Sequence, residues 1–238
     1  MSPKSQWGCG ASCNPCFRKG ELMTEEIKAN IERFEALLNR INRIGMEDVK
    51  SFIKKSDFYT APASTRFHLS EAGGLLKHSL HVYDCLMSKK GNPLWSKVLE
   101  NVSDETLTLV SLLHDVCKTY YYVASTKNQK TYDPDKVAAA NPRTVKKDAQ
   151  GSFIWETVPC YVVDNKYPLG HGNKSVVFLM QFITMSMEEI TAITFHMGAY
   201  CDSSLWNELG QAYEKYPLAL ALHEADMEAT HLLEVENG

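Results

Sequence analysis

The residues best suited to chemistry are a histidine and an aspartate that stand side by side, His114 and Asp115. They close the apolar run Ser-Leu-Leu-His-Asp-Val-Cys-Lys, whose periodicity predicts a helix. A charged group among buried residues is costly unless it is paired or bound to a cation. Because a His-Asp dipeptide is common by chance, its meaning depends on whether similar groups occur in similar apolar settings.

Four further groups of this kind do occur. His78 follows Gly-Gly-Leu-Leu-Lys, Asp226 ends Ala-Leu-His-Glu-Ala-Asp, His171 precedes an apolar helical segment, and His196 lies near the end of another. If all six groups converge, they could hold one or two divalent transition metal ions. Imidazole with carboxylate suits Mn, Fe, Ni, Co or Zn better than calcium. Two ions bridged by one carboxylate would clamp a phosphoryl group and generate hydroxide to attack phosphorus.

A structural interpretation of the same residues stays open. Buried polar residues and helix caps also place histidine and aspartate in apolar segments. This alternative applies most to His171 and His196, and it would reduce the site to a single ion. Lys118 could be a solvated residue that follows the helix, or it could contact phosphate and stabilise the transition state.

The order of these residues resembles the HD superfamily of metal-dependent phosphohydrolases. The similarity is greatest to the HD module of bacterial 3′–5′ exoribonucleases, and it spans roughly residues 61–229. The matching motifs are Ala61-Pro62-Ala63 with His68, Gly73 to His78, His114-Asp115 with Lys118, Leu169-Gly170-His171, and Leu222-His223 with Ala225-Asp226. The resemblance implies an all-α HD bundle in which Asp115 bridges the metals and Lys118 neutralises phosphate charge.

Three departures from the exoribonuclease pattern narrow the expected substrate. His196-Met197-Gly198 stands where the family shows two adjacent histidines before glycine. The residues before Ala61 indicate helices rather than the RNA-binding OB-fold of the exoribonucleases. The segment between Lys118 and His171 is also longer. We therefore expect hydrolysis of a nucleotide, another phosphate-containing small molecule or a short oligonucleotide. A non-catalytic nucleotide-binding module and a true exoribonuclease are the alternatives.

Other residues are candidates for supporting roles. His68 precedes the motif helix in a polar loop and could bind substrate. His81 and His223 lie three residues from His78 and Asp226 respectively, so either could be a hydrogen-bond partner that orients a ligand. His231 is expected to be an ordinary surface residue.

The elements that must position these residues are mostly helical. Thr24 before two glutamates, Ser186 with Glu189, and Pro217 each mark the start of a helix. Apolar periodicity predicts helices that begin near residues 25, 49, 74, 104, 187 and 217, with the one at 104 continuing to Cys117 and the last reaching Leu233.

One region breaks the helical pattern, at about residues 119–166. Residues 120–124 and 153–163 are rich in aromatic and β-branched side chains, which favours strands. The polar segment between them, from Lys127 to Lys147, contains six basic and two acidic residues. We therefore expect a β-hairpin inserted into the helical domain, with a basic loop. That loop is either a solvated surface or a lid whose Arg143 and Lys146 steer an anionic substrate.

Composition is that of an ordinary globular protein: 238 residues, 25 basic and 29 acidic, with a net charge of −4. No apolar run reaches the roughly 18 residues of a membrane helix, so no membrane partner is expected. Seven cysteines, an odd number, fit reduced thiols and a cytoplasmic location. Residues 1–22, with Cys9, Cys13 and Cys16, are expected to form a flexible tail before a single domain at 23–238. The sequence does not determine the oligomeric state. It also does not determine whether these three cysteines bind a metal.

Overall fold

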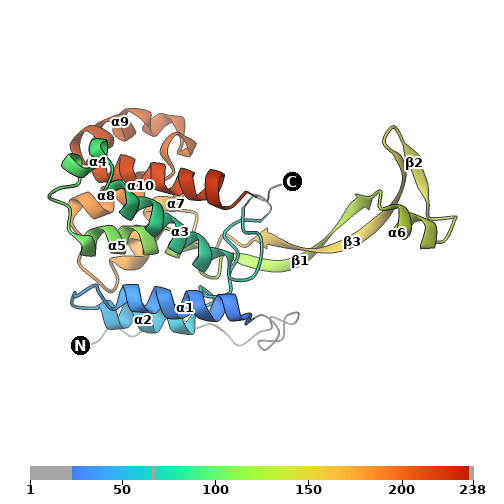
Figure 1. Cartoon of the computed structure of the whole chain (residues 1–238), viewed down its shortest axis with the longest axis horizontal. Helices are drawn as coiled ribbons and strands as arrows, with labels where there is room; N and C mark the ends of the chain where they lie inside the picture. Colours follow the sequence, from blue (N-terminus) through green and yellow to red (C-terminus); the bar gives the residue numbers. More distant parts are fainter. Residues whose placement is uncertain (1–22, 66–67, 236–238) are drawn as a thin grey trace.

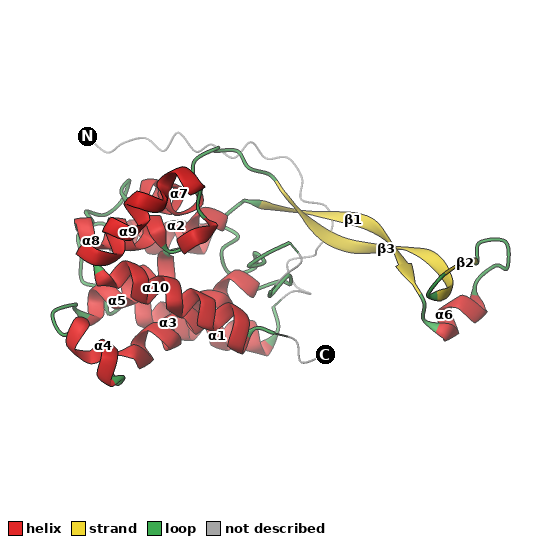
Figure 2. Ribbon diagram, turned by 90° about the horizontal axis from the view of Figure 1, so that it is seen from above, coloured by secondary structure: helices red, strands yellow, loops and turns green. Residues whose placement is uncertain are grey.

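The computed structural model describes residues 23–65 and 68–235, and the fold is mostly helical. A bundle of helices carries a long β-arm that extends away from it (Figure 1, Figure 2). The helices are α1 (Glu25–Leu38), α2 (Met46–Lys55), α3 (Gly74–Lys89), α4 (Pro93–Val98), α5 (Asp104–Leu113), α6 (Pro134–Ala139), α7 (His171–Leu179), α8 (Met187–Phe195), α9 (Trp206–Lys215) and α10 (Pro217–Glu228).

The arm is an antiparallel sheet of three strands in the order β1-β3-β2. Its strands are β1 (Tyr122–Thr131), β2 (Lys146–Asp148) and β3 (Gly151–Val163). Tyr122 pairs with Val163 at the bundle end, and Thr131 pairs with Ile154 at the far end. At about 3.4 Å per residue, this pairing makes the ribbon roughly 30 Å long.

Helix α5 lies at the centre of the bundle because its sequence is apolar on every face. All seven residues from Leu107 to Leu113 are buried. Helices α3 and α8 contact it directly, and α10 packs against both α3 and α8. A helix that is hydrophobic all round must be covered on all sides. The His-Asp pair that follows α5 therefore lies in the interior of the bundle.

The helix ends at the His-Asp pair. The prediction that it continues to Cys117 is therefore wrong. α5 ends at Leu113, His114 caps it, and a short 3₁₀ turn η1 (Val116–Lys118) follows. In a continuous α-helix, adjacent side chains point about 100° apart. The break lets the side chains of His114 and Asp115 face the same centre.

The polar segment 127–147 was predicted as a loop, and this prediction is wrong in part. β1 runs on to Thr131, and the segment also contains α6 and the start of β2. The reason is a local apolar cluster: Phe153 is buried under Tyr132, with ring centroids 5.7 Å apart. The predicted helix starts at Thr24, Ser186 and Pro217 are confirmed.

Two adjacent glycines bring a loop against the start of α3. Gly73 has a φ of +81°, and a Cβ on Gly74 would lie 2.1 Å from the carbonyl oxygen of Leu69. Only glycine permits this approach. The loop that carries His68 is consequently held close to the helix that carries His78.

Asp57 anchors the base of the arm, where its Oδ1 accepts a hydrogen bond of 2.8 Å from the backbone N–H of Tyr120. Burial raises the pKa of Asp57 to about 6. The folded protein therefore retains this proton to a higher pH than the unfolded chain, whose carboxyl titrates near pH 4. It follows that the stability contribution of the protonated carboxyl is lost as pH rises from about 4 to about 6.

We expect Asp57→Asn to remove this pH dependence, because the amide keeps the acceptor oxygen and carries no charge. The variant should gain stability relative to wild type between pH 4 and 8, on the order of 2 kcal/mol. Urea unfolding of both proteins across this range measures the difference. Unfolding free energies that differ by the same amount at every pH would contradict the assignment.

No helix among the described residues is both long and apolar enough to cross a lipid bilayer. The predicted flexible tail, with Cys9, Cys13 and Cys16, lies outside the described residues.

Candidate metal centre

The six side chains predicted as metal ligands converge inside the bundle. Each of the four histidines has a ring nitrogen within 3.6 Å of a carboxylate oxygen of Asp115 or Asp226. They come from five places in the fold: His78 in α3, His114 and Asp115 after α5, His171 at the first position of α7, His196 at the end of α8, and Asp226 in α10.

The two carboxylate oxygens of Asp115 face different histidines. Oδ1 lies 2.5 Å from Nε2 of His171 and 3.6 Å from Nε2 of His196. Oδ2 lies 3.5 Å from Nε2 of His114 and 3.8 Å from Nε2 of His78. Asp115 is itself buried, with 2% of its surface exposed. This divided arrangement suits a carboxylate that bridges two ions.

His114 and His196 are held in the same way. Nδ1 of His114 lies 2.8 Å from the carbonyl oxygen of Ser111, and Nδ1 of His196 lies 2.7 Å from that of Ile193. A carbonyl only accepts, so each Nδ1 donates and each neutral ring has its lone pair on Nε2. Both Nε2 atoms are buried and have no hydrogen-bond partner among the described residues. A buried imidazole lone pair without a donor fits a metal ion, and the backbone bond fixes the ring that would hold it.

Glu234 is a residue of the centre that sequence reasoning missed. A π-helical turn, η4 (Ala229–Leu233), follows α10 and carries Glu234 back to α3. Its carboxylate accepts from Nδ1 of His78 at 3.0 Å and from Nδ1 of His81 at 2.9 Å. His81 is therefore linked to the candidate ligand His78 through Glu234. No motif or periodicity near the end of the chain signals this role.

His223, predicted as a hydrogen-bond partner near Asp226, serves His196 instead. Its Nδ1 donates to the backbone carbonyl of His196 at 2.7 Å. Gly198, at φ +54°, makes room for this ring, since a Cβ there would lie 2.4 Å from it. His223 thus fixes the backbone that presents the candidate ligand His196.

The two aspartates are held as carboxylates. Burial alone would raise the pKa of Asp115, but Lys118, His114 and His171 hold it well below its usual range. Burial opposes ionisation of Asp226 as well, and the hydrogen bond from His78 outweighs it and lowers the pKa. Both groups are therefore ready to bind a cation at neutral pH.

The pKa values of the histidines differ according to how closely each ring contacts a carboxylate. Burial alone would lower the pKa of His78, but Asp226 and Glu234 raise it to about 10. Burial likewise opposes protonation of His171, and Asp115 raises its pKa to about 10. Burial lowers the pKa of His114 to about 4, so this ring is neutral. The carboxylates therefore favour a positive charge beside them. A protonated imidazole supplies that charge here, and a metal ion would supply it too.

The centre is not fully enclosed. The side chains of His171, Asp226 and His68 are 26%, 15% and 18% exposed, whereas those of His114 and His196 are fully buried. His68 lies beside His78, with ring centroids 5.1 Å apart, and its Nε2 is buried and has no hydrogen-bond partner among the described residues. This position is compatible with the predicted contact between His68 and substrate.

Lys118 lies at the same centre, paired with a ligand. Its Nζ is 2.6 Å from Oδ2 of Asp115, and its side chain is 11% exposed. Burial would lower the pKa of Lys118, but the Asp115 carboxylate raises it, so the ammonium is retained.

Overlapping groups of ligand atoms mark where ions could sit. In each group the atoms lie within 4.8 Å of one another. One group near Asp115 includes Cys117, which was not predicted, and its Sγ is 3.4 Å from Nδ1 of His171. The groups are His68, His78 and Glu234; His78, His114 and Asp226; His114, Asp115 and His196; and Asp115, Cys117 and His171.

Two predicted substrate-binding residues are not brought to the centre. Lys146 begins β2, which pairs with the first residues of β3 at the far end of the arm, and Arg143 precedes it in the same connection. Figure 1 and Figure 2 show α6 and β2 at the end of the arm opposite the bundle. The inserted hairpin therefore does not lie over the metal ligands as a lid.

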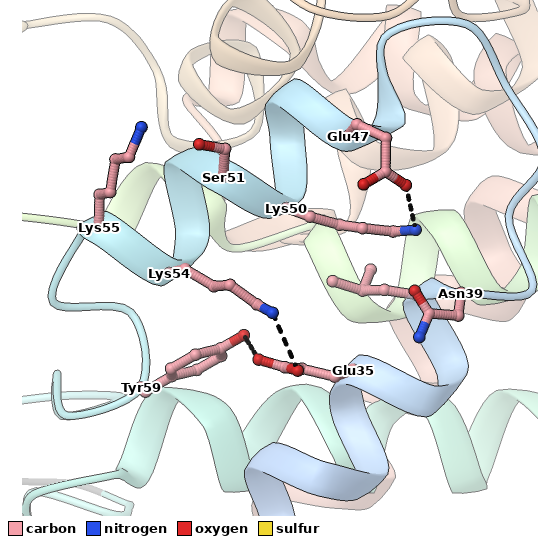
Figure 3. A pocket seen from close by; sticks show the side chains of 9 residues that line it. Glu35, Asn39, Glu47, Lys50, Ser51, Lys54, Lys55 and Tyr59 are labelled. Carbon is pink, nitrogen blue, oxygen red and sulfur yellow. Dashed lines mark hydrogen bonds and ion pairs between the residues drawn. The ribbon is translucent and has the colours of Figure 1, made fainter.

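A separate pocket of about 330 Å³ lies between α1 and α2, and none of its lining residues belongs to the metal centre. Figure 3 shows two of its lysines paired with glutamates, Lys54 with Glu35 and Lys50 with Glu47, while Lys55 is drawn without an ion pair. Tyr59 also donates to Glu35. This pocket has few free polar groups for a ligand.

Comparison with known proteins identifies no relative: no family model, no curated protein and no solved structure matches the chain.

Proposed function

We propose that this protein is a metal-dependent phosphohydrolase with an HD-type helical bundle, acting on a nucleotide or a short oligonucleotide. The observation that carries the proposal is the pair of buried Nε2 atoms of His114 and His196, which face Asp115 and have no hydrogen-bond partner in the described parts of the chain. The motif order that resembles the HD superfamily supports the same chemistry.

The described residues fit one or two divalent ions of Mn, Fe, Ni, Co or Zn. His78, His114 and Asp226 would hold one ion, and His171 and His196 a second. Asp115 would serve both, since its two oxygens face the two sets separately. Such an ion lowers the pKa of bound water toward neutrality and polarises a phosphoryl oxygen.

Lys118 supplies the positive charge for an anionic substrate. Its ammonium is paired with Asp115 and reaches the same centre from η1. With Asp115 engaged in holding a cation, the ammonium of Lys118 would be available to a phosphate oxygen, where it would stabilise the developing charge. The partly exposed side chains of His171 and Asp226 are where a substrate would reach the centre.

A panel of substrates tests this function. Metal-stripped protein is given each of the five ions in turn and assayed on nucleoside mono-, di- and triphosphates, cyclic dinucleotides and short oligonucleotides. We expect release of phosphate or of a nucleotide with at least one substrate, only when metal is present. Stoichiometric nucleotide binding without turnover for any ion would instead favour the non-catalytic module. Stepwise shortening of long single-stranded RNA would favour the exoribonuclease.

We expect Glu234→Gln to weaken metal binding about 10–100-fold, the usual effect of losing a group that orients a ligand. Both imidazoles bond to Oε1, and His78 also contacts Oε2 at 3.1 Å. The amide replaces one of these oxygens with an NH₂ group, which donates and so faces the N–H of His78, and it removes the negative charge. Competition with a chelating dye measures the affinity. Glu32→Gln, at an exposed position of α1, is the matched control. Equal affinities for the two variants would show that Glu234 does not position His78.

A further inference from the structure

The end of the arm is folded in its own right. An isolated two-stranded ribbon is marginally stable in water. Here residues 127–156, which we call the head, add β2, α6 and a small apolar cluster. Phe153 is 5% exposed and contacts Tyr132 and Trp155, and the ammonium of Lys130 lies 4.4 Å from its ring centre. The head is thus preorganised although the ribbon holds it away from the bundle.

The charges of the head are not balanced internally. Lys130 pairs with Asp148 and Lys136 with Glu156. Asp133 accepts from the first backbone N–H groups of α6. The remaining cations are exposed and form no ion pair with any described residue: Lys127, Arg143, Lys146 and Lys147.

The rest of the chain has the opposite charge. The head contains six basic and four acidic residues, a net charge of +2, while the whole chain carries −4, so the remainder carries −6. A basic end on a stiff arm, attached to an acidic body, directs a polyanion to the head and away from the bundle surface. The head also presents a large aromatic side chain, since Trp155 is 51% exposed.

We propose that the head binds nucleic acid through the phosphate backbone. A two-stranded β-ribbon fits the major groove of a duplex, and an exposed tryptophan offers a stacking surface to an unpaired base. The four free cations supply the phosphate contacts. This inference stands apart from the proposed hydrolytic function, because the head and the metal centre lie at opposite ends of the arm (Figure 1).

The shape of the arm favours this partner over a small anion. The free cations are spread over β1, β2 and the connection from α6 to β2, rather than gathered around one pocket. Such a spread matches a ligand whose charges repeat along its length. A second copy of the chain is a poorer match, because like-charged heads would repel each other.

Fluorescence anisotropy with a labelled DNA duplex about two helical turns long, and with its separate strands, tests the proposal. Chelator is present throughout, so that hydrolysis cannot consume the probe. With four phosphate contacts, duplex affinity should fall about 100-fold between about 50 and 200 mM salt. The combined K127Q, R143Q, K146Q and K147Q variant should lose most of the binding at low salt and most of the salt dependence.

The control removes the same charge from the bundle, at the exposed residues Arg40, Lys55, Lys97 and Lys215, each replaced by glutamine. It should bind like wild type, and circular dichroism should show both variants folded. Equal loss of binding in the two variants, or no binding by wild type at low salt, would overturn the proposal. A third result would also overturn it: sedimentation shows a concentration-dependent dimer that the head variant alone disrupts, and no nucleic acid binds.

Discussion

Asp115→Asn is expected to abolish both metal binding and hydrolysis. The carboxylate is the one group that lies near all four ligand histidines, through its two oxygens. The amide has nearly the same shape but lacks the charge, and it turns one acceptor into a donor that faces an imidazole. The ion's share of transition-state stabilisation is several kcal/mol, so hydrolysis should fall at least about 1,000-fold.

Folding must be separated from chemistry in this variant. Asp115→Asn also removes the carboxylate partner of the largely buried Lys118, which is costly by itself. Asp57→Asn is the matched control, because it makes the same change at a half-buried carboxyl that is not one of the predicted ligands. Urea unfolding monitors both proteins. A folded D115N protein that still binds metal and hydrolyses substrate at the wild-type rate would contradict the assignment of Asp115.

Lys118→Met is expected to separate metal binding from phosphate chemistry. Methionine fills a similar volume without the charge, so a loaded ion should stay bound while hydrolysis falls about 100–1,000-fold. Without metal, the variant leaves Asp115 buried and without its lysine, a loss of about 3–5 kcal/mol in unfolding free energy. Added metal should therefore raise the melting temperature of K118M by more than it raises that of wild type.

Lys89→Met is the control for the two effects expected of Lys118→Met, the loss of hydrolysis and the larger metal-induced rise in melting temperature. Lys89 is also a buried lysine, paired with Glu224 and Glu228, but it lies about three turns along α3 from His78. Lys89→Met should destabilise the protein equally with and without metal and leave the metal-induced shift unchanged. Unchanged hydrolysis in K118M would exclude Lys118 from the reaction.

Signals that act within one turn of helix predict the fold well. Thr24 and Ser186 cap helices through hydrogen bonds to residues three positions away, and Pro217 opens one because its ring fixes φ and it needs no N–H partner. The structure confirms all three. The end of α5 is different. Apolar periodicity continues past Leu113, but the chain turns there so that His114 and Asp115 can face one centre. The position of this turn depends on side chains from α3, α7, α8 and α10. A pattern confined to neighbouring residues carries no information about them.

The candidate site shows the same division. The order of its motifs picked out the six candidate ligands, and the structure brings these side chains together. Glu234 was missed because its contact with His78 spans 156 positions and follows a π-helical turn that apolar periodicity does not distinguish from an α-helix. Arg143 and Lys146 lie between two ligand motifs in sequence, yet the ribbon carries them to the far end of the arm. Strand length there depends on the packing of Phe153.

The central claim is that His78, His114, Asp115, His171, His196 and Asp226 hold catalytic metal. Equilibrium dialysis of metal-stripped wild-type and D115N protein against each ion, with elemental analysis and the hydrolysis assay on the same samples, tests it most directly. We predict one or two ions bound per wild-type chain, activity that rises with occupancy, and neither in D115N. Full hydrolysis by metal-stripped protein, or wild type that binds none of the five ions, would contradict the claim.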